Sequence, residues 1–290
     1  MRRHTGRYIA SRRRFLISST ATSLTTALTL ALTLAGSRGA RADNTSNKPT
    51  IALMGATSRS GREIIRQGLA AGYKIKGLAR TPSKLGIEHE NLEMFEGDIR
   101  DPASLENMLS GDEVVVSMVG RGAPDDPMAE VGPVDIYTVM ATNLIAAMKA
   151  KGNTRLIMAS STGVEHRADV NAAKPEPTDM TQMWRWNARY LYNDMYEMEE
   201  MIAASGLEYI LLRPGFMVEE PARGDMQFNL TNDTPGARII TYADFAAFIL
   251  DHLRGPEYLN TAIGLYSDNV MNPQAEIEKF LATQKANQKQ

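Results

Sequence analysis

The sequence contains no cysteine among its 290 residues. Disulfide bonds, thiol nucleophiles and thiolate metal sites are therefore excluded, and stability must come from the packing of the core. Long apolar runs are also missing, because the N-terminal run Leu24 to Ala35 has only twelve residues, several of them threonine. A membrane-spanning helix needs about 20 apolar residues, so this run is too short to cross a bilayer.

What the N-terminal part does contain is the pattern of an export signal. A basic segment, "SRRRFLISS" at residues 11–19, precedes the apolar run, and a small-x-small site ends at Ala42. The order of Arg12, Arg13 and Phe15 resembles a twin-arginine signal. We expect residues 1–42 to be a cleaved leader, the export machinery to be a partner, and the mature protein to be periplasmic or otherwise exported. The alternative is an uncleaved membrane anchor or a basic leader without an export role.

Removal of the leader changes the charge. Residues 1–42 hold eight of the 32 basic residues and none of the 34 acidic ones, so the mature chain carries 24 against 34, a net charge of about −10. An acidic surface repels phosphate backbones and anionic lipids. We therefore expect neither nucleic acid nor a membrane surface as a partner after cleavage.

Beyond a polar linker at residues 43–49, apolar runs without polar alternation alternate with segments of helical periodicity. This pattern predicts an α/β fold, a doubly wound parallel sheet of the Rossmann type, in a single domain over residues 50–270. Two excursions, 164–183 and 216–241, are expected to cover a substrate, and residues 271–290 to form a helical tail. The predicted strands are 50–54, 73–79, 91–96, 113–119, 155–160 and 208–213, and the predicted helices are 61–72, 102–109, 134–152, 183–206 and 241–253.

The stretch "GATSRSG", residues 55–61, follows the first predicted strand and opens the first helix. Gly55 allows a sharp turn and Gly61 allows the helix to pack closely on the sheet, while amide groups at the helix start favour a pyrophosphate. Ser58 stands where a middle glycine is expected, and its hydroxyl can donate to a phosphate. Thr57, Arg59 and Ser60 complete the candidate loop.

Arg80 ends the second predicted strand, 25 positions after Gly55. A site for NAD would carry Asp or Glu here to accept from the ribose 2′-hydroxyl, whereas arginine can pair with a 2′-phosphate. The sequence therefore favours NADP over NAD. The alternative for Arg80 is a solvated surface cation.

The stretches "GATSRSG", "LARTPSKL", "GDIRDPASL", "LIMASSTGV" and "SGLEYILLRPG", in this order, resemble the atypical short-chain dehydrogenase/reductases with NAD(P)H-binding domains, the group that includes flavin/biliverdin-reductase-B-like and NmrA-like proteins. The resemblance covers most of residues 50–266. It implies adenine contacts at Asp98 and Ile99, cofactor contacts at Val119, Gly120 and Arg121, and a nicotinamide-facing pair at Ser160 and Ser161. It further implies a turn over the nicotinamide end at Arg213, Pro214 and Gly215. Asp98 has a simpler alternative, a cap on the next helix, which Asp101 can also provide.

Short-chain reductases usually pair a tyrosine with a lysine four residues later, because the ammonium lowers a phenol pKa that is normally near 10. The helix "RYLYNDMYEMEEMIAASG" offers no such pair: Tyr192 is followed four positions on by Tyr196, and the lysine position of related proteins falls near Met195. Methionines 195, 198 and 201 are better read as a buried helix face than as copper ligands, so no metal site is expected.

Three interpretations remain open. The protein is an NADP(H)-dependent oxidoreductase acting on a small planar or carbonyl substrate, with protonation by Ser161, Tyr192 or water. Alternatively, it is an NmrA-type module that binds NADP(H) without turnover. In the third interpretation Arg185 or Arg189 replaces the lysine as a fixed charge. An epimerase or isomerase that recycles a tightly bound NAD(P) is a further alternative, because reduced cofactor is not expected to be abundant outside the cytoplasm.

Overall fold

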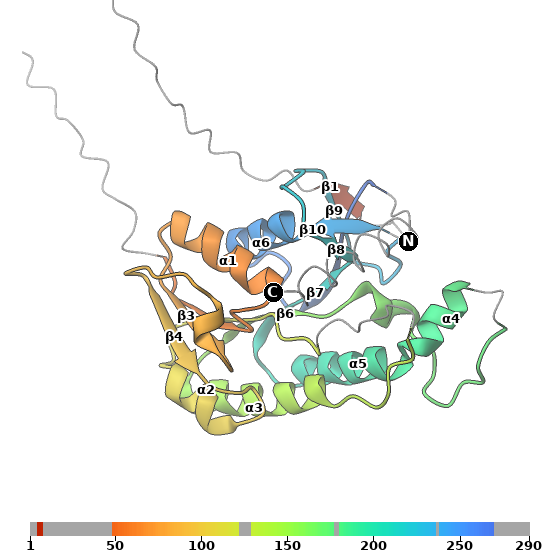
Figure 1. Ribbon diagram of the computed structural model, residues 1–290, viewed down its shortest axis with the longest axis horizontal. Helices are drawn as coiled ribbons and strands as arrows, with labels where there is room; N and C mark the ends of the chain where they lie inside the picture. The colour runs from red at the N-terminus through yellow and green to blue at the C-terminus, as the bar shows by residue number, and fades with distance from the viewer. Residues whose placement is uncertain (1–4, 8–47, 122–128, 177–179, 236–237, 270–290) are drawn as a thin grey trace, which may run out of the picture.

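The main sheet has nine strands in the order β1-β9-β11-β7-β6-β5-β2-β3-β4 (Figure 1). The structure, a computed structural model, describes residues 5–7, 48–121, 129–176, 180–235 and 238–269. Seven neighbouring strands of the sheet run parallel, namely β11, β7, β6, β5, β2, β3 and β4. Strand β9 is antiparallel to β11, and β1 is antiparallel to β9. The strands are β1 (Thr5–Arg7), β2 (Ile51–Met54), β3 (Ile75–Ala79), β4 (Leu92–Glu96), β5 (Val114–Ser117), β6 (Arg155–Ala159), β7 (Glu208–Pro214), β9 (Met226–Asn229) and β11 (Thr261–Ser267).

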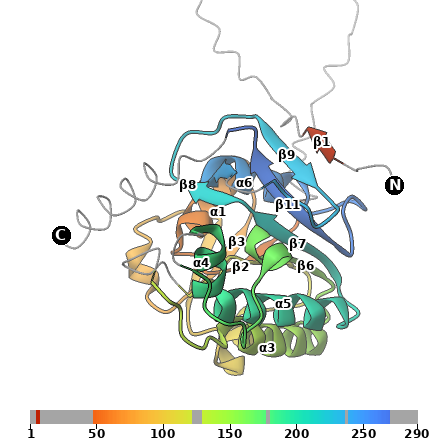
Figure 2. The ribbon, with the colours of Figure 1, turned by 90° about the vertical axis from the view of Figure 1, so that its right-hand side faces the viewer.

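Helices cover both faces of this sheet, as the two views in Figures 1 and 2 show. On one face α1 packs beside α6, and on the other α3 packs between α2 and α5. The doubly wound α/β architecture expected from the alternating pattern is therefore confirmed. The helices are α1 (Arg59–Ala70), α2 (Pro102–Met108), α3 (Ile136–Lys151), α4 (Met180–Asn187), α5 (Arg189–Ala203) and α6 (Tyr242–Asp251), with 3₁₀ turns η2 (Pro82–Lys84) and η3 (Thr162–His166).

The order of the strands creates a switch point. From β2 the chain moves outward through β3 and β4, then crosses back to β5 and continues through β6 and β7 in the other direction. Loops at the carboxyl ends of β2 and β5 therefore diverge, and the crevice between them is where open α/β sheets bind their ligands.

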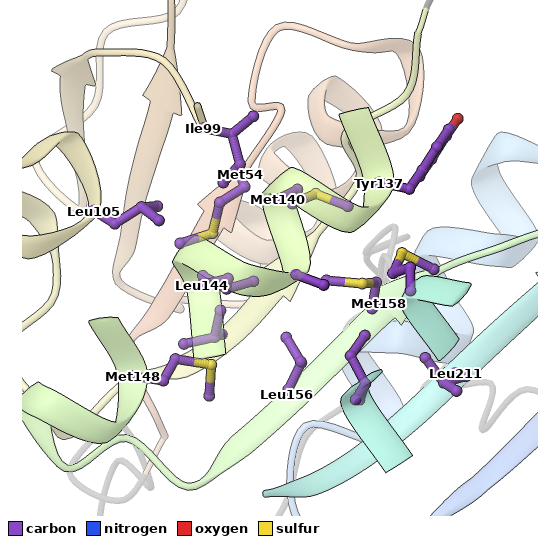
Figure 3. Packing of buried hydrophobic residues seen from close by; sticks show 14 of the residues in the cluster. Met54, Ile99, Leu105, Tyr137, Met140, Leu144, Met148, Leu156, Met158 and Leu211 are labelled. Carbon is purple, nitrogen blue, oxygen red and sulfur yellow. The ribbon is translucent and has the colours of Figure 1, made fainter. Parts of the chain in front are cut away.

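The core between the sheet and α3 is rich in methionine (Figure 3). Met54, Met140, Met148 and Met158 are all fully buried in it. Methionine is flexible and polarisable and fills irregular gaps, so packing of this kind supplies cohesion in a chain without cysteine.

One predicted helix is in fact two. The segment 183–206 is interrupted at Ala188, whose φ of −96° and ψ of 11° separate α4 from α5. The backbone N–H of Val131 donates to the carbonyl of Asn187 at 2.8 Å, so this carbonyl serves a tertiary contact at the break. The apolar spacing continues through the break and gave no warning of it.

The excursion 216–241 also differs from expectation. Part of it is regular: β8 (Phe216–Val218) pairs in parallel with β10 (Ile239–Thr241), and β9 joins the main sheet. These strands are three or four residues long, too short to show a periodicity. Within the predicted leader 1–42, residues 5–7 form β1 and pair with β9, while residues 1–4 and 8–42 lie outside the described residues. Residues 43–47 of the linker and the predicted tail 271–290 lie outside them as well.

Candidate dinucleotide and substrate site

The loop between β2 and α1 has the backbone geometry that its glycines predicted. Gly55 has a φ of +79°, and a Cβ there would lie 2.8 Å from the carbonyl oxygen of Met118. A Cβ on Gly61 would lie 2.2 Å from the carbonyl oxygen of Gly55, so α1 can approach the loop only with glycine at this position. Both positions exclude every other side chain without a shift of the backbone.

Ser58 departs from the glycine pattern at no conformational cost. Its φ of −69° and ψ of 163° are extended values that any residue adopts. The Ser58 hydroxyl oxygen accepts from the N–H of Gly61 at 3.0 Å and so caps the N-terminus of α1. The hydroxyl proton is not used in this contact, and the first turn of α1 contains no acidic residue. The dipole of α1 therefore keeps its attraction for an anion at this end.

A cavity of about 530 Å³ lies at the carboxyl ends of β2, β3 and β5 and reaches the turn after β4. Its size falls in the range of cofactor sites. Its lining brings together nine of the predicted cofactor residues, namely Gly55, Thr57, Ser58, Arg80, Asp98, Ile99, Val119, Gly120 and Arg121.

Arg80 lines this cavity with an exposed side chain. Within the described part of the chain, its guanidinium makes no hydrogen bond or ion pair, so its charge is available to a ligand. Arg62, which the sequence did not single out, holds the neighbouring loops together. Its guanidinium donates to the carbonyls of Thr57 at 3.2 Å and Leu85 at 2.8 Å, and also to that of Lys84. No motif marks such a side chain, because its acceptors are backbone carbonyls.

The turn after β4 forms another wall. One carboxylate oxygen of Asp98 accepts from the N–H of Arg100 at 2.9 Å, and the buried side chain of Ile99 follows it. The cap of α2 is Asp101, whose carboxylate accepts from the N–H of Ala103 at 3.1 Å. Asp98 is therefore not that cap, and its position on the cavity wall is consistent with the predicted adenine contact.

An ion pair lies on the same wall of the cavity. A guanidinium nitrogen of Arg100 lies 2.5 Å from a carboxylate oxygen of Asp135, and both residues line the cavity. The side-chain amide of Asn143 donates to the carbonyls of Ile99 and Arg100 at 3.0 Å and so holds this turn against α3. The pair ties the turn after β4 to the N-terminus of α3, which is a positional role, since exposed pairs of this kind add little stability.

Two predicted catalytic hydroxyls meet at the carboxyl end of β6. The side chain of Tyr192 interacts with that of Ser161, whose hydroxyl oxygen accepts from the N–H of Gly163 at 3.1 Å. Burial raises the pKa of Tyr192 to about 12, and the Ser161 hydrogen bond offsets only part of this effect. A neighbouring ammonium would have lowered the pKa, so the environment of this tyrosine agrees with the missing lysine.

Gly163 is a site residue that the sequence did not reveal. A Cβ at this position would lie 2.2 Å from Cζ of Tyr192, because the phenol ring packs directly on the backbone of η3. Ser160, the other half of the serine pair, is 7% exposed, and its hydroxyl oxygen has no hydrogen-bond partner among the described residues. A buried hydroxyl without a partner is costly and is a candidate for contact with a ligand.

Arg59 and Ser60 face away from the cavity. The Arg59 guanidinium lies 5.2 Å from the centre of the Tyr242 ring, in the wall of a second cavity beside α1 and α6. The Ser60 hydroxyl contacts the sulfur of Met217 at 4.0 Å. The structure therefore places them in the loop without bringing their side chains to the cavity wall.

The three residues of the predicted turn after β7 all contact other parts of the protein. The Arg213 guanidinium donates to the Glu199 carboxylate at 2.5 and 3.0 Å and lies 3.8 Å from that of Glu165. Burial lowers its pKa, but these two carboxylates outweigh burial and raise it above the ordinary value. The Pro214 carbonyl accepts from Thr162 at 3.3 Å, and a Cβ on Gly215 would meet the Arg238 carbonyl at 2.5 Å. None of the three lines the 530 Å³ cavity, so their cofactor contacts stay a prediction.

Of the two arginines considered as substitutes for the lysine, Arg189 is fully engaged. It pairs with Glu130 at 2.8 Å and donates to the carbonyls of Trp186 and Val170. Among the described residues, the Arg185 side chain makes no hydrogen bond or ring contact with Tyr192. Within the described ranges, no group of three or more potential ligands could hold a metal ion. In those same ranges, no helix combines the length and hydropathy of a membrane span.

The parallel sheet with its switch point, the glycine loop and the cavity beside it define a dinucleotide-binding α/β protein. The match of residues 55–256 to the model of the NAD(P)H-binding family makes the assignment specific. The chain belongs to the NAD(P)H-binding family.

Known proteins with a similar sequence or structure include reductases. The chain is 26% identical to the reductase pytE of Aspergillus terreus over 264 residues, which is 76% of this chain and 98% of that protein. Among solved structures it resembles a short-chain dehydrogenase/reductase of Veillonella parvula in complex with NADP, with a TM-score of 0.58, 18% identity and coverage of 77% and 96% of the two chains. It also resembles ChuY, an anaerobilin reductase of Escherichia coli O157:H7, with a TM-score of 0.55, 20% identity and coverage of 76% and 98%. These two similarities show the fold alone.

Proposed function

We propose that this protein is an NADP(H)-dependent oxidoreductase acting on a small planar or carbonyl substrate. The observation that carries the proposal is the Ser161–Tyr192 pair at the end of β6, which lies beside β5 in the sheet and so on the same edge as the dinucleotide cavity. A cavity for the cofactor and a neighbouring pair of hydroxyls for the acceptor are the two parts that a reductase needs.

The choice of NADP is supported by Arg80. Its uncommitted guanidinium stands on the cavity wall after β3, where a 2′-phosphate can pair with it. Gly55, Gly61 and the N-terminus of α1 would hold the pyrophosphate, and Asp98 with Ile99 would border the adenine. When bound, the reduced cofactor supplies a hydride.

The protein's own part in the chemistry is to orient the acceptor and to supply hydrogen bonds. Tyr192, with a pKa of about 12, is a weak proton donor at neutral pH. Its hydroxyl and that of Ser161 can fix an oxygen of the substrate, while the proton that completes the reduction comes from water. Acceptors whose reduced form is stabilised by conjugation need little acid catalysis and suit this site.

A module that binds NADP(H) without turnover is the second candidate. The same high pKa of Tyr192 and the absence of a lysine at Met195 favour it. Both candidates need the cofactor, and only the first needs an acceptor.

The test is to purify the natively produced protein, identify any released nucleotide by mass, and follow NADPH oxidation with quinones, flavins and carbonyl compounds. Oxidation of NADPH that depends on the acceptor supports the reductase. Tight binding of NADPH with no oxidation by any acceptor of the set supports the binding module. A protein that neither contains nucleotide nor binds added NADPH contradicts both.

We also propose that the protein is exported through the twin-arginine route with its cofactor already bound. The support is the leader pattern around Arg12 and Arg13, and the fact that this route transports folded proteins. Export with a bound nucleotide would supply the cofactor to a compartment in which it is scarce.

A further inference from the structure

The chain's two tryptophans, Trp184 and Trp186, lie two positions apart on α4 and have different surroundings. Trp186 is engaged within the protein. Its indole N–H donates to the carbonyl of Ala172 at 2.9 Å, the guanidinium of Arg189 lies 3.8 Å from its ring centre, and the ammonium of Lys174 lies 5.1 Å from it. Trp186 therefore anchors α4 to the loop after η3.

Trp184 has almost none of these contacts. It is 38% exposed and is the one large exposed hydrophobic side chain in the described ranges. Its indole N–H makes no hydrogen bond to any described residue. A single exposed apolar side chain needs no explanation by itself. The position of Trp184 relative to the Ser161–Tyr192 pair does need one.

The Trp184 ring is perpendicular to the Tyr192 ring, with 6.5 Å between their centres and 89° between their planes. The buried Tyr192 ring is in turn fixed by its packing on the backbone of Gly163, and its hydroxyl interacts with Ser161. Helix α4, at the right of the molecule in Figure 1, therefore brings Trp184 against the ring of Tyr192. Tyr192 is buried, whereas Trp184 is partly exposed.

This combination selects for shape. A partly exposed indole ring beside a fixed phenol ring can stabilise a flat ring system by stacking, and the hydroxyls of Ser161 and Tyr192 can bond a polar atom on the edge of that ring system. A flexible aliphatic substrate gains the hydrogen bonds without the stacking. Discrimination between the two classes of substrate then depends on one side chain.

We propose that Trp184 is the specificity-determining residue of the substrate site, and that it selects a flat, conjugated ring system at least as wide as an indole. The inference rests on the proposed reductase function, because it names the class of acceptor for that same site. Trp184 is assigned to binding of the acceptor and not to binding of the nucleotide, since it does not line the dinucleotide cavity.

The first arm of the test is kinetic and uses the full mature chain. The variants are Trp184→Ala, the conservative Trp184→Phe and the matched control Trp186→Phe. The probes are 2-methyl-1,4-naphthoquinone as the flat acceptor and an open-chain aliphatic ketone as the other, and NADPH affinity is measured for each variant. We expect Trp184→Ala to raise KM for the naphthoquinone by about tenfold, the order of magnitude of one lost aromatic stack. Trp184→Phe should recover most of this loss, while KM for the ketone and the affinity for NADPH should change by less than about twofold.

The second arm does not require turnover. In Trp186→Phe, the single remaining tryptophan is Trp184, so its fluorescence reports on that side chain alone. With oxidised NADP present to avoid absorption by NADPH, the naphthoquinone should quench the fluorescence of Trp186→Phe saturably and that of Trp184→Phe much less.

The outcomes separate the two proposals. An unchanged KM for the naphthoquinone in Trp184→Ala, or equal quenching in the two single-tryptophan variants, overturns the role of Trp184 and leaves the reductase assignment intact. If the wild-type protein binds NADPH and reduces neither probe, the reductase assignment fails, and the quenching arm still decides whether a flat ring binds against Trp184.

Discussion

At the scale of the residue, the site depends on a few positions at which the size or the charge of the side chain is critical. Gly55 and Gly61 are sterically required, and Ser58 is tolerated because its backbone is extended and its hydroxyl caps α1. Arg80 is the clearest candidate for a functional residue, because its charge has no partner among the described residues.

Reversal of the charge at Arg80 tests the choice of cofactor. Arg80→Glu should weaken binding of NADPH at least about tenfold and affect NADH much less, because a charge-assisted hydrogen bond is worth roughly 1.5–3 kcal/mol. Isothermal titration with both nucleotides measures the difference. The control is Lys74→Glu, the same change in charge at an exposed position before the other end of β3. Equal losses for NADPH and NADH in Arg80→Glu would contradict the 2′-phosphate contact.

Gly163 allows a second test at this scale. In Gly163→Ala the new methyl group would overlap the Tyr192 ring, so the ring or η3 must move. Such overpacking costs about 1–3 kcal/mol, which corresponds to a fall in Tm of roughly 2–12 °C for a domain of this size. Calorimetry measures the fall, and turnover should fall with it because Tyr192 is displaced from Ser161. Gly132→Ala is the control, since a Cβ there meets nothing within 4 Å. A Tm equal to that of the control would show that the ring has free space to move into.

At the scale of the element, a buried carboxylate links several parts of the sheet. Glu113, just before β5, lies 2.6 Å from the ammonium of Lys76 on β3. It also accepts from the side-chain amide of Asn153 at 3.0 Å and from the N–H of Ser110 at 3.0 Å. Burial raises the pKa of Glu113, but these hydrogen bonds outweigh it and hold the pKa at about 2.

This depressed pKa predicts a component of acid unfolding. A carboxylate with a lower pKa in the folded state adds stability above its unfolded value of 4.5 and loses it as the pH falls from 4.5 toward 2. The contribution should be about 2 kcal/mol after allowance for screening. Urea denaturation between pH 2 and pH 7 should show the free energy of unfolding of wild type approaching that of Glu113→Gln across this window. A constant difference between the two proteins over the whole range would refute the assignment.

The helices and strands also show which features the hydrophobic periodicity of the sequence can predict and which it cannot. The long buried strands β2 and β5 were predictable, because strands covered on both faces are continuously apolar. The break at Ala188 was not, because it coincides with a hydrogen bond from Val131, which is 57 residues away in the sequence. The ion-pair cluster of Arg213, Glu199 and Glu165 was not predictable either, because it joins β7, α5 and η3.

At the scale of the whole molecule, the proposed twin-arginine export depends on the arginine pair in the leader predicted for residues 1–42. Replacement of both arginines, Arg12→Lys/Arg13→Lys, should leave the full-length precursor in the cytoplasm, since the twin-arginine receptor reads the pair. Cell fractionation and the mass of the recovered chain provide the measurement, and the wild-type chain should begin at Asp43. Equal export of the variant would exclude the twin-arginine route, whereas a cytoplasmic wild type would exclude export.

The sequence by itself determined the class of fold, the glycine loop and the position of Arg80, because these features depend on local backbone conformation and on the ends of single strands. It also indicated that the usual lysine is missing. Only the tertiary structure decided which of these side chains meet. It brought Ser161 against Tyr192, engaged Arg213 and Arg189 within the protein, and left Trp184 open beside the pair. Contacts between distant segments follow from how elements pack, and no short stretch of sequence encodes them.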